Sequence, residues 1–335
     1  MPHYVARMIE ATGLSRSFTT RHGEVHAVRT VDMHVAGGEI VGFLGPNGAG
    51  KTTTLRMLTT LLAPTAGTAT VAGSDLTRDP VGVRRKVGYV AQGGMTSPEA
   101  RAGEEIVDHA RLYGIRRAPA TGRAKALFDL LDLPGLWDRP CGSLSGGQRR
   151  RLDIAMGLVH EPGMVFLDEP TTGLDPQSRA NLWGHIRGLR DDHGATVLLS
   201  THYLEEADAL CDRVFIIDHG EIVARGTPDE LKRRVSGDTV TLRLPAAGDT
   251  AIAARVAAGV AGGEPIVDGT SVHIQVADGA ATLPPLLRSL DLDGIEASAV
   301  EVRRPSLDDV FLDLTGRSLR DQATTTTGVG YAHRA

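Results

Sequence analysis

The sequence predicts an α/β fold followed by a smaller α+β domain, and two observations support this prediction. Short apolar runs alternate with amphipathic, helix-like stretches from about Ile40 onward, at 40–44, 164–167, 196–199 and 214–217. Such runs are typical of a buried, mostly parallel sheet with helices on its faces. After about Gly237 the composition shifts to Ala, Gly and Val. We therefore expect a large domain over residues 5–235 and a small one over 238–318.

Residues 95–135 interrupt the alternation of apolar and helix-like stretches in the large domain. The stretches 99–114 and 121–133 have helical patterns with no strand between them, which indicates a helical subdomain over about 95–160. The small domain mixes expected strands with expected helices, the strands at 240–244, 272–276 and 297–303 and the helices at 249–258, 280–290 and 306–315. The tail 319–335 has no apolar periodicity, so we expect it to be disordered.

Composition excludes several classes of protein. The 335 residues are 41% hydrophobic, which is enough for a proper core, and the net charge of −5 gives no basic field that would attract nucleic acid. Cys141 and Cys211 form no CxxC pair, so we expect reduced thiols in a cytoplasmic protein. No apolar run has the length of a signal peptide or of the roughly 18 residues that cross a bilayer, so we expect a chain that is neither secreted nor membrane-spanning.

A glycine-rich segment fits the pattern G-x-x-x-x-G-K-S/T, in the order Gly45, Pro46, Asn47, Gly48, Ala49, Gly50, Lys51 and Thr52. It lies directly after an expected strand and before an expected helix, where backbone N–H groups and the helix N-terminus can bind phosphate. Lys51 would reach the β- and γ-phosphates of a nucleotide, Thr52 would bind Mg²⁺, and Thr53 would be a further nucleotide contact. A glycine-rich turn that binds nothing would not need Lys and Thr at its end.

Two adjacent carboxylates, Asp168 and Glu169, end the apolar run at 164–167. Acids at the end of a buried strand are costly unless something uses them. Asp168 would hold Mg²⁺, and Glu169 would be the general base that polarises the attacking water. A solvated strand end is the alternative, and the phosphate loop on the same chain makes it the weaker one.

A third motif, Leu144-Ser145-Gly146-Gly147-Gln148, distinguishes this chain from a kinase, a GTPase or a helicase. It resembles the signature motif of ABC ATPases, and a serine hydroxyl with glycine N–H groups at a helix N-terminus suits an anion. The resemblance covers residues 5–235 and implies a P-loop NTPase core with an antiparallel β subdomain and a helical subdomain. It also implies a head-to-tail homodimer, in which Ser145 to Gln148 of one subunit complete the ATP site of the other.

Four more positions match the family in order. Gln92 resembles the glutamine that touches Mg²⁺ and the attacking water, and Asp175 lies in the loop that contacts the opposite subunit. His202 resembles the histidine that senses the γ-phosphate, and Phe18 lies where the family stacks an aromatic ring on adenine. Taken singly, each would be an ordinary loop, structural or core residue. Two features depart from the family: Phe18 replaces the more usual Tyr, and the loop 91–94 lacks a Pro and has two glycines, which should loosen it.

The resemblance implies an ATP- and Mg²⁺-dependent ATPase on the cytoplasmic face of the membrane, working with a separate permease and with no nucleic acid. The segments 171–176, 200–207 and 304–316 resemble exporter ATPases of the daunorubicin-resistance type, which implies export of a drug or other hydrophobic compound. For the small domain we expect a dimer-stabilising or regulatory role.

Two alternatives come from other classes. A soluble ABC ATPase acting on DNA or ribosomes would have a long coiled coil or two cassettes in one chain, and neither pattern occurs in this sequence. A phosphotransferase would not need the motif at 144–148.

Overall fold

The computed structural model describes residues 7–21, 23–235, 237–316 and 319, and the chain divides into two compact units. The first unit ends at Thr227 and the second begins at Pro228. The sequence placed the end of the first domain at 235, whereas the short helix α8 (Pro228–Lys232) belongs to the second unit. The tail that we expect to be disordered lies outside the described residues except for Leu319.

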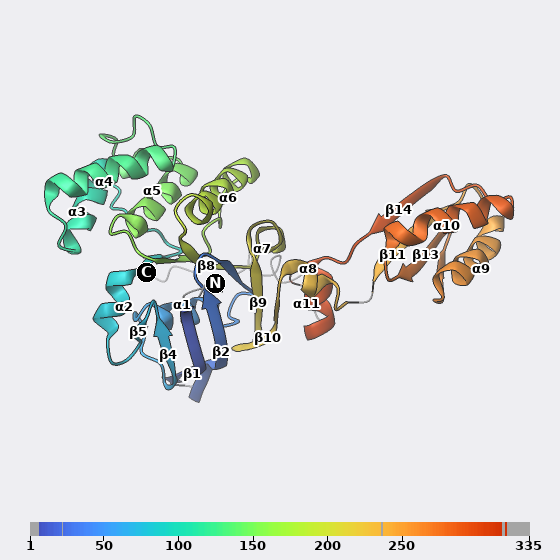
Figure 1. Ribbon diagram of the computed structural model, residues 1–335, viewed down its shortest axis with the longest axis horizontal. Coiled ribbons are helices and arrows are strands. Elements are labelled where there is room, and N and C mark those ends of the chain that lie inside the picture. The colour runs from blue at the N-terminus through green and yellow to red at the C-terminus, as the bar shows by residue number, and fades with distance from the viewer. Residues whose placement is uncertain (1–6, 22, 236, 317–318, 320–335) are drawn as a thin grey trace, which may run out of the picture. The chain divides into compact units, whose positions relative to one another are not determined.

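A ten-stranded sheet forms the centre of the first unit, in the order β5-β4-β1-β2-β10-β9-β3-β8-β7-β6 (Figure 1). Its parallel part consists of β3 (Ile40–Leu44), β6 (Val87–Val90), β7 (Met164–Asp168), β8 (Thr196–Thr201) and β9 (Arg213–Asp218). Every residue of β3, β7 and β8 is buried, which explains their continuous apolar runs. The carboxyl ends of these strands meet at one edge, where the candidate site lies.

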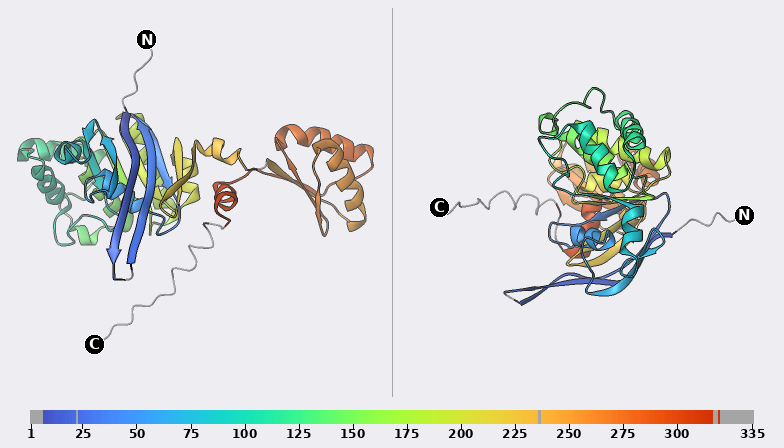
Figure 2. Two further views of the ribbon diagram at one scale, coloured as in Figure 1. Left: turned by 90° about the horizontal axis from the view of Figure 1, so that it is seen from below. Right: turned by 90° about the vertical axis from the view of Figure 1, so that its left-hand side faces the viewer.

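The other side of the sheet is antiparallel. The long strands β1 (Arg7–Thr20) and β2 (Gly23–Ala36) pair with each other, and β4 (Ala66–Val71) and β5 (Ser74–Asp75) follow at the edge. Figure 2 shows β1 and β2 as two long neighbouring arrows. The strand β10 (Glu221–Gly226) joins the two parts, since it pairs parallel with β2 and antiparallel with β9. The predicted α/β class with an antiparallel β subdomain is therefore confirmed.

Helices of the first unit connect these strands. Four accompany the sheet: α1 (Lys51–Leu58), α2 (Pro80–Lys86), α6 (Pro176–Asp191) and α7 (Leu204–Leu210). Three more, α3 (Ala102–Leu112), α4 (Arg117–Leu130) and α5 (Gly146–Leu158), pack together as the helical layer in the upper left of Figure 1. This layer is the helical subdomain that the sequence predicted.

The second unit has its own sheet, in the antiparallel order β12-β13-β11-β14. The strands are β11 (Asp238–Arg243), β12 (Ile266–Asp268), β13 (Ser271–Val276) and β14 (Ala299–Arg303), and α9 (Thr250–Ala261) and α10 (Gly279–Leu292) pack on them. The sequence did not predict β12, because its three residues are all exposed and form no buried run. The helix α11 (Leu307–Thr315) contacts α8 and begins with a capping box between Ser306 and Asp309.

The length and apolarity of a helix determine whether it can span a bilayer. A transmembrane helix needs roughly 20 apolar residues. Within the described ranges, no helix is both long enough and apolar enough to cross a membrane.

Candidate active site

The glycine-rich segment forms the turn between β3 and α1, as its sequence context predicts. Gly45 has no room for a side chain, since a Cβ there would lie 2.2 Å from the carbonyl oxygen of Ile217. Gly48 and Gly50 have φ angles of 81° and 103°, which L side chains rarely adopt. No side chain caps the N-terminus of α1, so its first N–H groups can bind an anion.

Lys51 lies folded against this turn. Its Nζ donates to the carbonyl oxygens of Gly45, at 2.7 Å, and Pro46, at 3.0 Å, and lies 3.5 Å from Glu169 Oε1. The side chain is only 4% exposed, and burial lowers the pKa of its amine although the nearby Glu169 carboxylate acts in the opposite direction. The Lys51 amine is thus placed beside the phosphate turn, with partners that a phosphate can replace.

Asp168 receives hydrogen bonds from three hydroxyl groups. Oδ1 accepts from Thr52 Oγ1 at 2.9 Å and from Ser200 Oγ at 2.6 Å, and Oδ2 accepts from the Tyr89 hydroxyl at 3.3 Å. The structure therefore brings together Thr52 and Asp168, the two oxygen donors predicted to hold Mg²⁺. Ser200 and Tyr89 were not predicted; the only signal for Ser200 is a polar residue at the end of a buried apolar strand.

Glu169 has an unusual backbone and a well-partnered carboxylate. Its φ angle of 44° is in the left-handed region, which costs a non-glycine residue on the order of 1 kcal/mol. Oε2 accepts from Gln92 Nε2 at 2.9 Å and from Thr172 Oγ1 at 3.1 Å, and His202 Nδ1 lies 3.4 Å away. Thr172 is a partner that the sequence did not predict.

The charge state of Glu169 follows from these neighbours. Burial raises its pKa, but the contacts with His202, Lys51 and Thr172 together outweigh burial and lower the pKa to about 2. The carboxylate is therefore ionised at neutral pH, as a general base must be. The structure thus collects Glu169, Gln92, His202 and Lys51, the four predicted catalytic residues, around one carboxylate.

A cavity of about 470 Å³ opens beside these groups. Its lining combines the phosphate turn, the start of α1 and three of the four predicted catalytic residues: Ala27, Asn47, Gly48, Gly50, Lys51, Thr52, Thr53, Gln92 and Glu169. Ala27, on β2, was not predicted. The size of the cavity suits part of a nucleotide.

The signature residues do not line this cavity. Ser145 and Gly146 are exposed, and Ser145 caps α5 in a reciprocal pair with Gln148: Gln148 N donates to Ser145 Oγ at 3.2 Å, and Ser145 N donates to Gln148 Oε1 at 3.0 Å. These signature residues therefore form an exposed, capped helix N-terminus that does not line the phosphate cavity of its own chain.

Two other predicted residues also lie outside the cavity lining. Asp175 caps α6 and accepts from Ser178 N at 2.9 Å, while half-buried Phe18 lies on β1 under the guanidinium of Arg16, 4.7 Å from its ring centre. Their roles in binding nucleotide stay predictions.

Comparison with known proteins agrees with this geometry. Residues 28–172 match the family model described as ABC transporter, and residues 226–315 match the model of the ATP-binding protein DrrA1-3-like, C-terminal domain. The daunorubicin resistance ATP-binding protein DrrA2 of Streptomyces coeruleorubidus is 43% identical over 298 residues, 88% of this chain and 92% of that protein. The Nod factor export ATP-binding protein I of Ralstonia nicotianae is 36% identical over 301 residues, 90% of this chain and 92% of that protein.

Solved structures show the same fold. A dimeric ATP-binding cassette in a post-hydrolysis state with ADP and Pi has a TM-score of 0.61 at 24% identity, over 66% of this chain and 98% of that one. An ATP-binding subunit of an ABC transporter has a TM-score of 0.59 at 29% identity, over 68% of this chain and 92% of that one.

The fold and the phosphate turn, with two buried carboxylates beside it, together define a P-loop ATPase. The identity to the Streptomyces protein extends over both units. The chain belongs to the ABC transporter family, as an ATP-binding and ATP-hydrolysing subunit related to drug-resistance and export ATPases. The predicted family and enzyme class are confirmed.

Proposed function

We propose that two copies of this chain bind two MgATP between them and power the export of a drug or other hydrophobic compound through a separate membrane permease. The observation that carries this proposal is the 43% identity, over both units, to a daunorubicin resistance ATP-binding protein. The relatives reported above give no support to the alternative, a nucleic-acid or ribosomal partner. The subunit would work on the cytoplasmic face of the membrane, where ATP is available.

The donor set supports Mg²⁺ as the metal. Mg²⁺ prefers hard oxygen ligands and is usually held by one or two protein groups together with phosphates and water. Thr52 and Asp168 offer such oxygens side by side, and Gln92 lies at the same site. Among the described residues, no cluster of three or more His, Cys, Asp or Glu side chains could hold a metal ion alone. Thr52, Asp168 and Gln92 would hold the ion, which would neutralise phosphate charge.

The exposed signature residues support the dimer. Ser145 and Gly146 are exposed and do not line the chain's own phosphate cavity, so a phosphate bound there would come from another molecule. In a head-to-tail pair, the γ-phosphate held by Lys51 of one copy would meet Ser145 of the other. The two copies would then close on ATP by a shift in population from an open to a closed dimer, driven by contacts that ATP makes only in the closed dimer.

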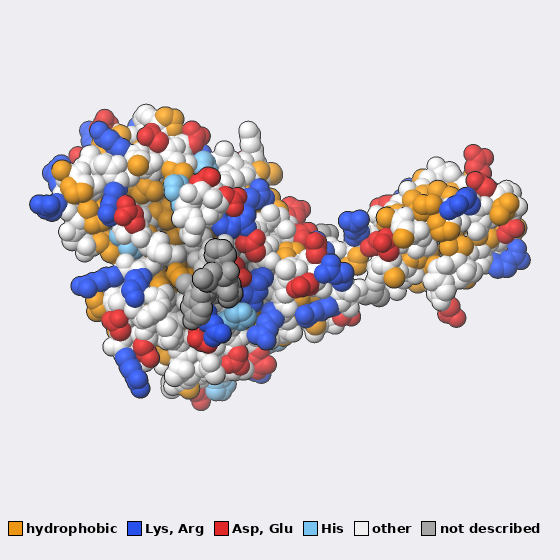
Figure 3. Space-filling view, in the orientation of Figure 1, with side chains coloured by type: hydrophobic (Ala, Val, Ile, Leu, Met, Phe, Trp, Pro, Cys, Tyr) orange, Lys and Arg blue, Asp and Glu red, His pale blue; other side chains and the backbone are white. Residues whose placement is uncertain are grey.

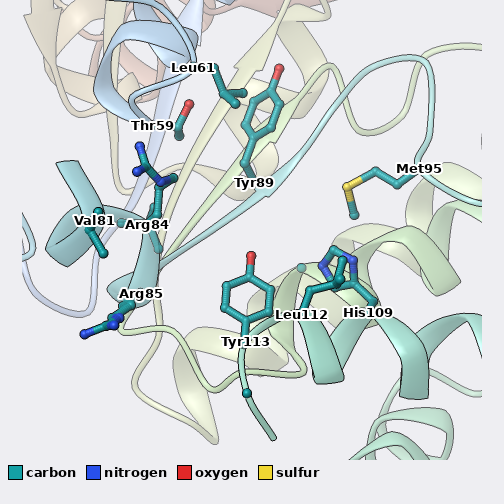
Figure 4. Close-up of a pocket in the computed structure, with 13 residues that line it drawn as sticks. Thr59, Leu61, Val81, Arg84, Arg85, Tyr89, Met95, His109, Leu112 and Tyr113 are labelled. Carbon is teal, nitrogen blue, oxygen red and sulfur yellow. The ribbon is translucent and has the colours of Figure 1, made fainter.

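A groove beside α3 supports a permease partner (Figure 4). It has a volume of about 630 Å³ and lies between the sheet and the helical layer, and we call it the α3 groove; its lining includes Leu61, Val81, Arg84, Arg85, Val87, Tyr89, Met95, His109, Leu112 and Tyr113. Leu112 is 82% exposed and Leu61 58% exposed. Figure 3 shows hydrophobic side chains gathered in the hollow between these two parts of the first unit.

The shape and charge of the α3 groove suit one kind of occupant. An amphipathic helix of the permease could place its apolar face on Leu61, Leu112 and Tyr113 and an acidic residue near Arg84 and Arg85. Tyr89 connects this surface to the chemistry, because it lines the groove and its hydroxyl donates to Asp168. Movement of the permease segment would therefore reach the metal ligand through one side chain.

Replacing Leu112 by aspartate tests the proposed docking. A charge at the centre of an apolar contact should reduce co-purification with the co-expressed permease on the order of tenfold or more. The matched control is Leu292→Asp, which places the same charge at an 88% exposed leucine of the second unit. Equal permease recovery with both variants, with ATP binding showing that both are folded, would contradict docking in the α3 groove.

A further inference from the structure

Arg150 is buried at the point where three segments of the active site meet. It lies on α5, two residues after Gln148, and is only 7% exposed. Its guanidinium donates to three backbone carbonyl oxygens: Nη1 to Ala91 at 2.6 Å, Nη2 to Asp168 at 2.8 Å and Nε to Pro170 at 2.9 Å. A planar guanidinium can bind several acceptors in fixed directions, which the ammonium group of a lysine cannot do.

Two of these acceptors bracket the general base. Asp168 and Pro170 are the chain neighbours of Glu169, whose φ angle of 44° is unfavourable for a residue with a side chain. Such a conformation persists only when the surrounding structure holds it. Arg150 binds the carbonyl oxygens of the residues before and after Glu169 and so restrains the backbone on both sides of it.

The third acceptor restrains the backbone next to another predicted catalytic residue, Gln92. Ala91 directly precedes Gln92, and Gln92 Nε2 donates to Glu169 Oε2. On the same helix, Asp153 Oδ1 accepts from Met95 N at 2.9 Å. The helix α5 therefore holds the Gln92 loop at both ends, at Ala91 through Arg150 and at Met95 through Asp153. This offsets the looseness that we expect from Gly93 and Gly94.

We propose that Arg150 is a positioning residue for hydrolysis, which sets the relative positions of Glu169 and Gln92 and ties both to the helix that carries the signature motif. Ser145 caps α5 and Arg150 lies one turn further along it. A displacement of α5 that moves Ser145 therefore also moves the peptide groups around Glu169 and Gln92. Contact of the signature motif with nucleotide would in this way adjust the geometry of the base.

Two substitutions in the full-length chain test this role. Arg150→Gln should lower kcat for ATP hydrolysis by about 10- to 100-fold, because a small displacement of the base is costly to catalysis. KM for ATP and the affinity for MgATP should change by less than about twofold, since Arg150 makes none of the expected nucleotide contacts. Arg150→Lys should give an intermediate kcat, because lysine keeps the charge and can donate to some of the carbonyl oxygens.

Two controls distinguish a positioning role of Arg150 from a general effect on protein stability: a substitution of another arginine and a double variant. Arg123 of α4 pairs with Glu161 at 2.9 Å, away from the cavity, and Arg123→Gln should leave kcat within about twofold of the original value. In the Glu169→Gln background, adding Arg150→Gln should change single-turnover hydrolysis little, because both substitutions remove one function. If Arg150→Gln does not fold, the kcat of Arg150→Lys carries the test.

Three results would overturn the proposal. An unchanged kcat in Arg150→Gln, or in Arg150→Lys if only that variant folds, would show that the carbonyl contacts do not matter for hydrolysis. A parallel loss of MgATP affinity would show a structural or binding role instead. Fully additive losses in the double variant would show that Arg150 does not act through Glu169.

Discussion

Replacing Glu169 by glutamine is expected to lower the turnover number for ATP hydrolysis by about 10²–10⁴-fold, the usual contribution of a general base. The carboxylate is ionised at neutral pH because His202 and Lys51 hold its pKa at about 2. Glutamine has nearly the same shape and can still meet Gln92 and Thr172, but it cannot take a proton from water. ATP binding should therefore survive, and ATP should keep two copies together.

The measurements for this variant are steady-state ATPase activity, nucleotide affinity and size-exclusion chromatography with and without MgATP. Glu205→Gln is the matched control, since Glu205 is an exposed acid of α7 and undergoes the same change of charge. Normal turnover in Glu169→Gln would remove Glu169 from the role of base. Loss of turnover together with loss of ATP binding would indicate a structural role for the carboxylate.

In the proposed dimer, each ATP site has two halves, Lys51 of one copy and Ser145 of the other. Substitution of either residue should also remove most ATP turnover. Lys51→Ala removes the cation that lies against the phosphate turn, and Ser145→Arg blocks the exposed N-terminus of α5. Removing one preorganised donor to a developing charge usually costs about 10²–10³ in rate, and we expect losses of at least this size. Lys51→Ala should in addition weaken ATP binding to the isolated chain, whereas Ser145→Arg should not.

Mixing the two inactive variants tests whether the halves come from different copies. A mixed dimer has one complete site, made of Lys51 from the Ser145→Arg copy and Ser145 from the Lys51→Ala copy. Single-turnover hydrolysis should therefore reappear in the mixture, and differently tagged copies show that mixed dimers form. Mixed dimers that hydrolyse no more ATP than either variant alone would indicate that the halves do not complement each other.

Most of the fold could be predicted from the sequence because burial controls the pattern. The parallel strands β3, β7 and β8 are buried on both faces, so each is a continuous apolar run. The helical layer and the helices of the second unit have apolar periodicity of their own. The exposed strand β12 and the position of α8 in the second unit could not be predicted, because pairing and packing define them rather than their own side chains.

The candidate site likewise has residues that could be predicted from the sequence and residues that could not. Lys51, Thr52, Asp168 and Glu169 could be predicted, because fixed spacing within each motif places the phosphate turn and the two carboxylates at the carboxyl ends of buried strands. The contacts of Ser200, Tyr89 and Thr172 could not, since ordinary hydroxyl residues acquire these partners only when the sheet forms. The proposed restraint of Glu169 by Arg150 could not be predicted either, because Arg150 is one of three consecutive arginines at 149–151 and only the structure shows that the middle one is buried.

A structure of the Glu169→Gln variant with MgATP would show whether one triphosphate is held by two copies of this chain. We expect each γ-phosphate to contact Lys51 of one copy and to lie within about 3 Å of Ser145 Oγ of the other. An ATP-bound structure in which Ser145 of every copy is remote from all nucleotide would contradict the account.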